Sequence, residues 1–346
     1  MTMDSRFELM NFEEDVNYHA PILLTHLVGA TDAGEAGGLV VSQILSSLPV
    51  KRVATFDTDS LIDYRANRPA VTINNWHVEE IDVPQIALDL VHDDSGTPIL
   101  VLHGPEPDAK WQLFADEVAE FAQDAGVEMV VSLTGMPAAV PHTRPTMVHL
   151  QSTDKELVAG QPKLTGGPIQ FPSSANTFLH HLLSKQGIEG VTFLAAVPYY
   201  MANMEYPKAS LALLERMTSV FDLSLPTGNI EANTQFVTEQ LRNLAGENEE
   251  VIALVGQLEK HFDNEIDEAV KKIGSFPTPA DFVFGSSESV EETDKLVDTD
   301  ALARTIEQFL ARTEDLDDPL LAEEDPSQPK PRHRAPRPWE IPDSNE

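Results

Sequence analysis

Two polar segments of the chain carry the side chains that could do chemistry. The segment from Asp59 to Pro69 holds two carboxylates, a tyrosine and two arginines, and the segment from Gly135 to Pro145 holds a histidine and an arginine. Guanidinium groups bind carboxylates and phosphates through paired hydrogen bonds, and an imidazole can exchange a proton near neutral pH. The pattern therefore allows an anion clamp with an acid or base beside it. The candidate ligand or interface cluster consists of Asp59, Asp63, Tyr64, Arg65, Arg68, His142 and Arg144.

A structural role accounts for the same residues. Arg65 and Arg68 can form ion pairs with the carboxylates of their own segment and so lock neighbouring elements or subunits together. His142 stands beside Arg144 without a nucleophile or a second histidine, which favours a structural role over a catalytic one. We therefore keep both interpretations open, a ligand site and a contact surface.

Several kinds of site lack their motifs. The chain has no cysteine, which excludes disulfides, thiolate metal sites and cysteine nucleophiles. Its 11 histidines show no metal-ligand spacing, and no serine lies in a G-x-S-x-G elbow. We predict no catalytic, cofactor-binding or metal-binding residues and no cofactor, and we favour a protein that is not an enzyme.

A glycine-rich loop from Gly29 to Gly38 follows an apolar run and precedes a predicted helix. Backbone amides at such a helix start bind anions, and Asp57 ends the next predicted strand, where dinucleotide-binding folds place an acid. The glycines do not follow the G-x-G-x-x-G spacing, however, and Asp32 and Glu35 would repel a pyrophosphate. The loop is therefore predicted to be a tight turn or a contact surface.

The predicted elements around these segments indicate an α/β fold. A strand from Pro21 to Ala30, a helix from Leu39 to Leu48 and a strand from Arg52 to Phe56 form a βαβ unit, which requires parallel strands. The turn around Gly96 predicts a hairpin between two apolar runs. Residues 127–133 and 191–197 are apolar without alternation, which is typical of central strands covered on both faces.

Helix signals follow later in the chain. Asp108 is predicted to cap a helix that runs to about Ala125, and Ser173 or Ser174 a helix that runs to about Lys185. From Pro207 the pattern is helical to about residue 275. The tyrosine-rich loop at residues 199–207 suits either a contact surface or ordinary packing.

We therefore predict an α/β domain over residues 1–275, with a mostly parallel sheet flanked by helices and a helical extension at about 206–275. Residues 288–325 carry 14 acidic and 3 basic side chains, and a Pro- and Arg-rich stretch follows them. Such composition cannot bury enough apolar surface to fold alone. Residues 276–346 are predicted to be a largely disordered tail.

The net charge of -34 bears on partners and location. Nucleic acid and anionic membrane surfaces both attract basic proteins, so neither is an expected partner. No apolar run approaches the roughly 20 residues of a membrane span, and the first residues do not follow the pattern of a signal peptide. We predict a cytoplasmic protein.

Four motifs in order carry a family resemblance: Asp59 to Pro69, Gly104 to Asp108, Gly135 to Pro145 and Val197 to Ala209. Over about residues 20–275 they resemble the actinobacterial branch of the proteasome assembly chaperone family, named for the second eukaryotic proteasome assembly chaperone. The resemblance implies a single α/β domain similar in architecture to purine nucleoside phosphorylases. It also implies an oligomer, because members are typically oligomeric.

Eukaryotic relatives in that family act as heterodimeric scaffolds on proteasome α-subunits, and many relatives dock through a C-terminal hydrophobic–Tyr–any tripeptide. The sequence ends Asp343 to Glu346 without such a tripeptide, so we do not expect that mode of docking. We predict a homo-oligomeric protein-interaction or assembly scaffold, with a proteasome subunit as the partner that the resemblance suggests. The alternatives are an enzyme or binding protein for a nucleoside-like or phosphorylated small molecule, and a structural homo-oligomer whose loops form subunit contacts.

Overall fold

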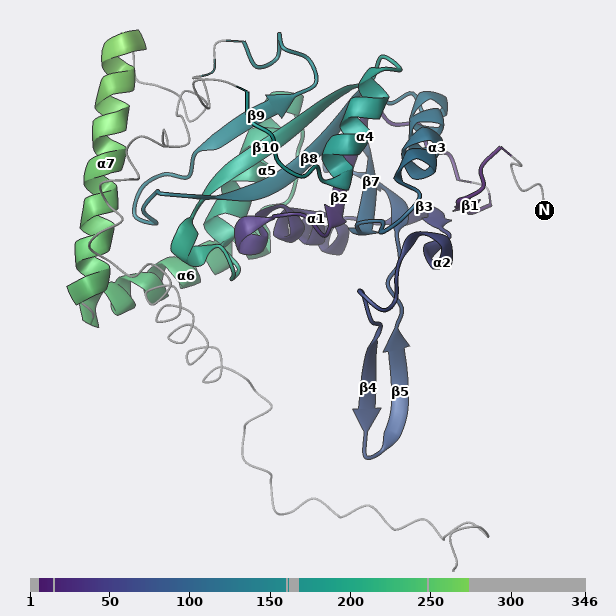
Figure 1. Ribbon diagram of the computed structural model, residues 1–346, viewed down its shortest axis with the longest axis horizontal. Helices are drawn as coiled ribbons and strands as arrows, with labels where there is room; N and C mark the ends of the chain where they lie inside the picture. Colours follow the sequence, from purple (N-terminus) through teal and green to yellow (C-terminus); the bar gives the residue numbers. More distant parts are fainter. Residues whose placement is uncertain (1–5, 15, 160, 162–167, 248, 274–346) are drawn as a thin grey trace, which may run out of the picture. The chain divides into compact units, whose positions relative to one another are not determined.

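Four parallel strands form the centre of one eight-stranded sheet (Figure 1). The computed structural model describes residues 6–14, 16–159, 161, 168–247 and 249–273, all within the unit 1–307. The strand order is β1-β3-β6-β7-β2-β8-β10-β9. The strands of this sheet are β1 (Met10–Phe12), β2 (Ile22–Val28), β3 (Lys51–Phe56), β6 (Ala87–His92), β7 (Pro98–Pro105), β8 (Met129–Ala138), β9 (Val148–Ser152) and β10 (Glu189–Pro198).

Parallel pairing is confined to the middle of the sheet. Strands β7, β2, β8 and β10 pair in parallel, whereas β1, β3 and β6 on one side and β9 on the other are joined by antiparallel pairs. The central strands read as continuous apolar runs because both of their faces are buried, as Leu23, Val131 and Phe193 illustrate. The predicted α/β class with a mostly parallel sheet is confirmed, since β2, β3, β7, β8 and β10 run in the same direction.

Helices cover both faces of the sheet (Figure 1). One face carries α1 (Ala36–Ser47) and α5 (Pro207–Phe221), which pack on each other, and the opposite face carries α3 (Trp111–Asp124) and α4 (Ala175–Ser184). The remaining helical segments are η1 (Ala33–Glu35), α2 (Thr58–Leu61), η2 (Tyr199–Met201), α6 (Gly228–Glu247) and α7 (Glu249–Ile273). Among the described helices, none combines the length and apolar composition that a membrane crossing requires.

The predicted βαβ unit forms with one difference in its spacing. Strands β2 and β3 run in the same direction, but β7 and β6 lie between them in the sheet. The hairpin predicted around Gly96 supplies these two inserted strands, and Gly96 has the positive φ of 89° that its turn requires. The crossover through α1 therefore spans two strands, and the loops that follow β2, β3, β7, β8 and β10 all leave the same edge of the sheet.

The two predicted helix caps have different outcomes. Ser174 caps α4, because its side chain accepts a hydrogen bond from the backbone N–H of Thr177. The prediction for Asp108 is wrong, since α3 begins after Lys110 and no side-chain hydrogen bond caps it. The carboxylate of Asp108 instead accepts the backbone N–H of Asp63 at 2.7 Å and the side-chain N–H of Asn67 at 3.0 Å.

The helical region predicted from Pro207 is present as α5, α6 and α7. Buried side chains on α7 recur at helical spacing from Val251 through Leu258 to Phe262. Phe262 packs against Met147 and Ala196, which places α7 on the loop between β8 and β9 and on β10. The tail predicted over residues 276–346 lies outside the described residues.

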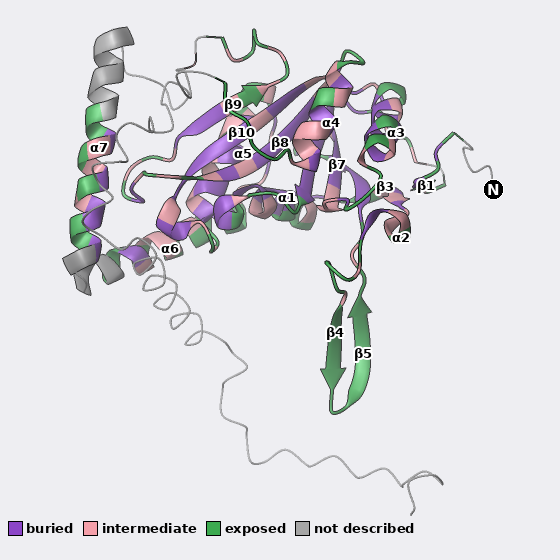
Figure 2. Ribbon diagram, viewed as in Figure 1, coloured by how far each residue is buried: buried purple, intermediate pink, exposed green. Residues whose placement is uncertain are grey.

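A second, two-stranded sheet went unpredicted. It consists of β4 (Ala70–Asn74) and β5 (His77–Asp82), which pair with each other in antiparallel fashion. All the residues of both strands are exposed (Figure 2). A strand is recognised in a sequence by the apolar residues of its buried face. This hairpin has no buried face, so that signal was missing.

Candidate functional site

The structure separates the two halves of the predicted cluster. The loop with Asp59 to Arg68 follows β3, and the loop with His142 and Arg144 follows β8, so both leave the same edge of the sheet. Strands β6, β7 and β2 lie between β3 and β8. Each loop is therefore described with its own neighbours.

The loop after β3 holds its acidic and aromatic side chains by local bonds. Tyr64 donates a hydrogen bond to Asp59 at 2.8 Å, and this bond raises the pKa of the Tyr64 hydroxyl. Asp63 accepts the backbone N–H of Arg65 at 2.9 Å. Within the described residues, Arg65 and Arg68 form no ion pair, and both are exposed. Their guanidinium groups are available to a partner or a ligand.

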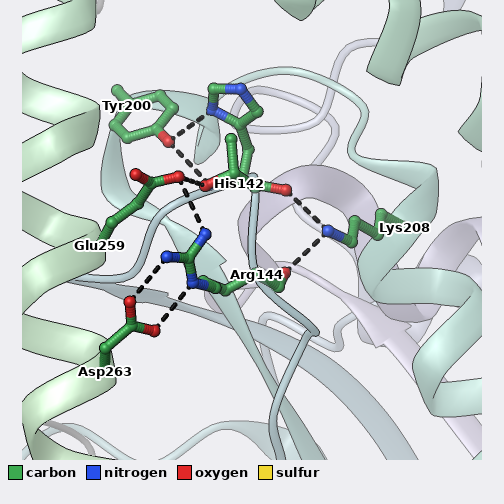
Figure 3. Close-up of polar contacts among 7 residues, drawn as sticks. His142, Arg144, Tyr200, Lys208, Glu259 and Asp263 are labelled. Carbon is green, nitrogen blue, oxygen red and sulfur yellow. Dashed lines mark hydrogen bonds and ion pairs between the residues drawn. The ribbon is translucent and has the colours of Figure 1, made fainter.

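Arg144, in the loop after β8, binds α7 (Figure 3). Its guanidinium donates to both carboxylate oxygens of Asp263, at 2.8 and 2.6 Å, and to Glu259 at 3.0 Å. Glu259 also accepts the hydroxyl of Thr143 at 2.5 Å. The bond from Arg144 lowers the pKa of Asp263, and the same bond raises the pKa of Arg144. Arg144 is therefore a clamp that ties α7 to the loop after β8.

His142 is buried behind this clamp. The hydroxyl of Tyr200 accepts the backbone N–H of His142 at 3.0 Å and lies 2.9 Å from its ring Nδ1 (Figure 3). Burial lowers the pKa of His142 to about 4, and the charge of Lys208 adds to this effect. A neutral imidazole accepts on one nitrogen, so the Tyr200 hydroxyl can donate to Nδ1 while it accepts from the backbone. His142 is therefore an uncharged hydrogen-bonding core residue at neutral pH.

Lys208 completes the arrangement from α5. Its ammonium donates to the backbone carbonyls of His142 at 2.6 Å and of Arg144 at 2.7 Å (Figure 3). Burial lowers the pKa of Lys208. The lysine, the arginine and the tyrosine thus fix the backbone of the loop, and among these described groups none is placed as an activated nucleophile.

Removal of the clamp is expected to loosen α7. We predict that Arg144→Ala lowers the free energy of unfolding by about 1 kcal/mol, because the ion pairs are half-exposed and solvent screens them. Hydrogen exchange of the amides in α7 should rise relative to those of β2. Arg216→Ala is a matched control, because Arg216 lies on α5 and its side chain forms no bond to α7 among the described residues. Unchanged exchange in α7 of the Arg144 variant would contradict the clamp.

The glycine-rich loop before α1 is closed by the chain's own carboxylate. Asp32 accepts the backbone N–H of Gly37 at 3.1 and 3.0 Å, of Gly38 at 3.0 Å and of Gly135 at 2.6 Å. These amides include the ones at the start of α1, where an anionic ligand would bind in a nucleotide-binding fold. The Asp32 carboxylate therefore occupies the position that a pyrophosphate would take, and the tight turn predicted here is confirmed.

A second helix start at this edge has the same arrangement. Glu106, which follows β7, accepts the backbone N–H of Ala175 in the first turn of α4. The carboxylate also lies close to Gly29, where a Cβ atom would come within 2.6 Å of it. Charged groups of the chain therefore neutralise the N-termini of both α1 and α4.

Replacement of Asp32 should expose an anion site. We expect Asp32→Ala to lower the free energy of unfolding by about 2–3 kcal/mol, because three amides lose a charged acceptor. Inorganic phosphate should restore part of this loss in the variant and leave the parent unchanged. Thermal denaturation over a phosphate series measures both effects, with chloride at equal ionic strength as the control. Equal phosphate responses of variant and parent would contradict the assignment.

One cavity of about 360 Å³ lies elsewhere, between the β9–β10 edge of the sheet and α4. The residues that line it include Ser152, Thr177, Thr192 and His180. The Nε2 atom of His180 is buried without a hydrogen-bond partner, and burial lowers its pKa to about 4. Among the residues that the structure describes, no member of the predicted cluster and no lysine or arginine lines this cavity. A neutral, polar molecule fits this lining better than a phosphate does.

Four residues of the clamp were missed in the sequence. Glu259 and Asp263 had no visible link to Arg144, since more than a hundred positions separate them. Tyr200 belongs to the tyrosine-rich loop, which we expected to be either a contact surface or ordinary packing. Because Tyr200 is buried, its role is packing. Lys208 belongs to the family motif at Val197 to Ala209, and its ammonium donates to backbone carbonyls of the motif at Gly135 to Pro145. Among the described residues, no group of three or more His, Asp or Glu could hold a metal ion.

The fold is an α/β sheet covered by helices on both faces. At the carboxyl edge of this sheet, charged side chains of the chain itself, Asp32, Glu106 and Arg144, bind the neighbouring helices. The sequence model of the PAC2 family matches residues 26–245. The chain therefore belongs to the PAC2 family. Among proteins with curated descriptions, none matches this chain.

Solved structures of similar proteins agree with the family. A protein of unknown function from Corynebacterium glutamicum has 32% identity and a TM-score of 0.70, covering 75% of this chain and 98% of its own. A protein of unknown function from Mycobacterium tuberculosis has 32% identity and a TM-score of 0.72, with 76% and 92% covered. A proteasome-assembly chaperone homologue from Mycobacterium tuberculosis has 25% identity and a TM-score of 0.61, with 68% and 99% covered.

Proposed function

We propose that this chain is a protein-binding scaffold with an assembly-chaperone-like role, and that it catalyses no reaction at the carboxyl edge of its sheet. One observation carries the proposal. The amides that would hold an anionic substrate at the start of α1 bind Asp32 instead. Open α/β sheets place their ligands at this edge, and here the chain's own carboxylate takes the position.

The exposed loop after β3 is the candidate contact surface. Arg65, Arg68 and Tyr64 stand there together, and arginine and tyrosine are enriched at protein interfaces. The two arginines form no ion pair in the described part of the chain, so an acidic surface of a partner could bind them. The Mycobacterium tuberculosis proteasome-assembly chaperone homologue suggests a proteasome subunit as that partner.

A binding experiment tests this function. Purified full-length chain is mixed with proteasome α-type subunits of the same organism, and the mass of the complex is measured by light scattering after size exclusion. We expect a complex of fixed stoichiometry. Arg65→Glu with Arg68→Glu should weaken it by about tenfold, because rim charges steer association. Lys155→Glu, another exposed charge reversal, is the control. Separate elution at every ratio would contradict the proteasome partner.

The rival function, binding of a small molecule, is favoured by one observation, the cavity with the unpartnered Nε2 of His180. Its neutral lining suits a nucleoside-like ligand better than a phosphorylated one. A saturable rise in melting temperature with adenosine that disappears in His180→Leu would support this rival. A cytoplasmic location and a homo-oligomeric state are predictions that accompany the scaffold.

A further inference from the structure

The cavity between α4 and the strands β9 and β10 has a polar lining without strong charges (Figure 1). Its volume of about 360 Å³ falls within the range of about 300–1,000 Å³ that is usual for small-molecule sites. Apart from Phe178 and Gly190, every described residue of the lining carries a hydroxyl, an amide or an imidazole group. No carboxylate, lysine or arginine is among these described residues. The lining therefore offers hydrogen bonds to a neutral molecule.

His180 is held in the wall of this cavity against a glycine of β10. A Cβ atom at Gly190 would lie 2.6 Å from the Cβ of His180 and 2.7 Å from its ring atom Nδ1, so the missing side chain makes the room that the imidazole occupies. His180 is 4% exposed, and its Nε2 atom has no hydrogen-bond partner among the described residues. A buried polar atom without a partner is unfavourable, and a ligand that bonds to this nitrogen removes the penalty.

Gln151 supplies a second free group in the same lining. It lies opposite Thr192 in the register of β9 and β10, so the two side chains share one face of the sheet. The hydroxyl of Thr192 is bonded to Ser132 at 2.9 Å. The side chain of Gln151, in contrast, is exposed and forms no hydrogen bond within the described part of the chain. An exposed amide and a buried imidazole nitrogen, both uncommitted, therefore line one cavity.

Hydroxyl groups are the ligand chemistry that matches these two groups. Burial lowers the pKa of His180 to about 4, so its ring is neutral and each nitrogen either donates or accepts. A hydroxyl can do both, and it therefore fits Nε2 in either tautomer; it also pairs with the amide of Gln151. Phe178 adds one apolar wall, on which the C–H groups of a sugar ring can pack, whereas a purine base presents two broad apolar faces.

We propose that this cavity binds a neutral, polyhydroxylated molecule of the size of a monosaccharide, with Nε2 of His180 and the amide of Gln151 as its hydrogen-bonding partners. The inference goes beyond the proposed function and does not depend on it, because neither Asp32 nor the loop after β3 contributes to the described lining. It also differs from the rival function, since its ligand carries no base.

NMR of the histidine rings tests the site directly. The full-length protein with ¹⁵N-labelled histidine is titrated with glucose, galactose, mannose and myo-inositol, and His180→Leu identifies the signal of His180 by its loss. We expect at least one of the four compounds to shift the Nε2 signal of His180 saturably, while the signal of the exposed His92 stays unchanged. Melting temperature is not a suitable measurement here, because sugars stabilise proteins by exclusion from their surface.

Equilibrium dialysis with the radiolabelled compound provides the affinities of the variants. Gln151→Trp fills the cavity from an exposed position and should weaken binding at least about tenfold, as should His180→Leu, which removes the buried nitrogen. Gln257→Trp, at an exposed position of α7, is the matched control and should bind like the parent.

Three results would each overturn the proposal. The first is a His180 signal that none of the four compounds shifts saturably. The second is an affinity that Gln151→Trp leaves equal to that of the parent. The third is tighter binding of adenosine than of all four compounds, which would assign the cavity to a nucleoside.

Discussion

The protein is expected to lose about 4 kcal/mol of its free energy of unfolding between about pH 7.5 and pH 5.5. His142, His149 and His180 are buried, and burial lowers the pKa of each to about 4. In the unfolded chain a histidine has its ordinary pKa near 6.5. From pH 6.5 down to about 4 the unfolded state therefore binds more protons, and stability falls as the pH falls. Each histidine contributes about 1.4 kcal/mol per pH unit in this window.

The overall charge predicts the opposite trend. Acidification reduces the self-repulsion of a chain with a net charge of -34 and a pI near 4.5, which would stabilise the folded state. The sign of the pH dependence thus decides which effect dominates. Urea denaturation at half-unit steps measures it. His180→Leu should reduce the loss by about a third, whereas His92→Gln, at an exposed position, should leave it unchanged. Stability that stays level or rises on acidification would contradict the role of the buried histidines.

Gly135→Ala is expected to cost more than about 3 kcal/mol or to prevent folding. A Cβ atom at Gly135 would lie 1.9 Å from the backbone oxygen of Ala33 and 3.1 Å from the Cβ of Ala36. Both neighbours belong to the turn into α1, and the amide of Gly135 also donates to Asp32 at 2.6 Å. Because the clash is with backbone, no change of side-chain rotamer can relieve it.

A helical glycine provides the matched control. Gly256 in α7 has no atom within 4 Å of a built Cβ, so Gly256→Ala should raise the free energy of unfolding by about 0.5–1 kcal/mol. Urea unfolding of both variants gives the comparison. A Gly135→Ala protein as stable as the parent would show that β8 and the start of α1 are not in close contact.

Central strands and local turns could be predicted from the sequence because their signals are local. The continuous apolar runs of β8 and β10, the turn at Gly96 and the cap at Ser174 each depend on neighbouring residues. The same signal at Asp108 gave a wrong prediction, because the carboxylate of Asp108 binds Asp63 and Asn67 on a distant loop and does not cap α3. A local motif predicts a helix cap only where no distant donor competes for the same side chain.

The site was predictable in its parts but not in its connections. The negative charge of Asp32 led us to expect that it would repel a pyrophosphate. In the structure its carboxylate accepts the hydrogen bonds of the backbone amides that a pyrophosphate would need. The binding partners of Arg144 could not be inferred, because Glu259 and Asp263 reach the loop only when tertiary packing, including that of Phe262, places α7 beside it. The β4–β5 hairpin could not be predicted, because none of its residues is buried and β5 lacks the alternation of a half-buried strand.

Ligand titration of the unmodified protein tests the scaffold assignment most directly. Melting temperature is followed against inorganic phosphate, ribose 5-phosphate and adenosine, with Asp32→Ala as the variant that can take an anion on the freed amides. We expect the unmodified protein to show no saturable gain with any of the three, while the variant responds to phosphate. A saturable gain in the unmodified protein that is lost in Arg65→Ala or Arg144→Ala would place a ligand at the sheet edge and contradict the scaffold.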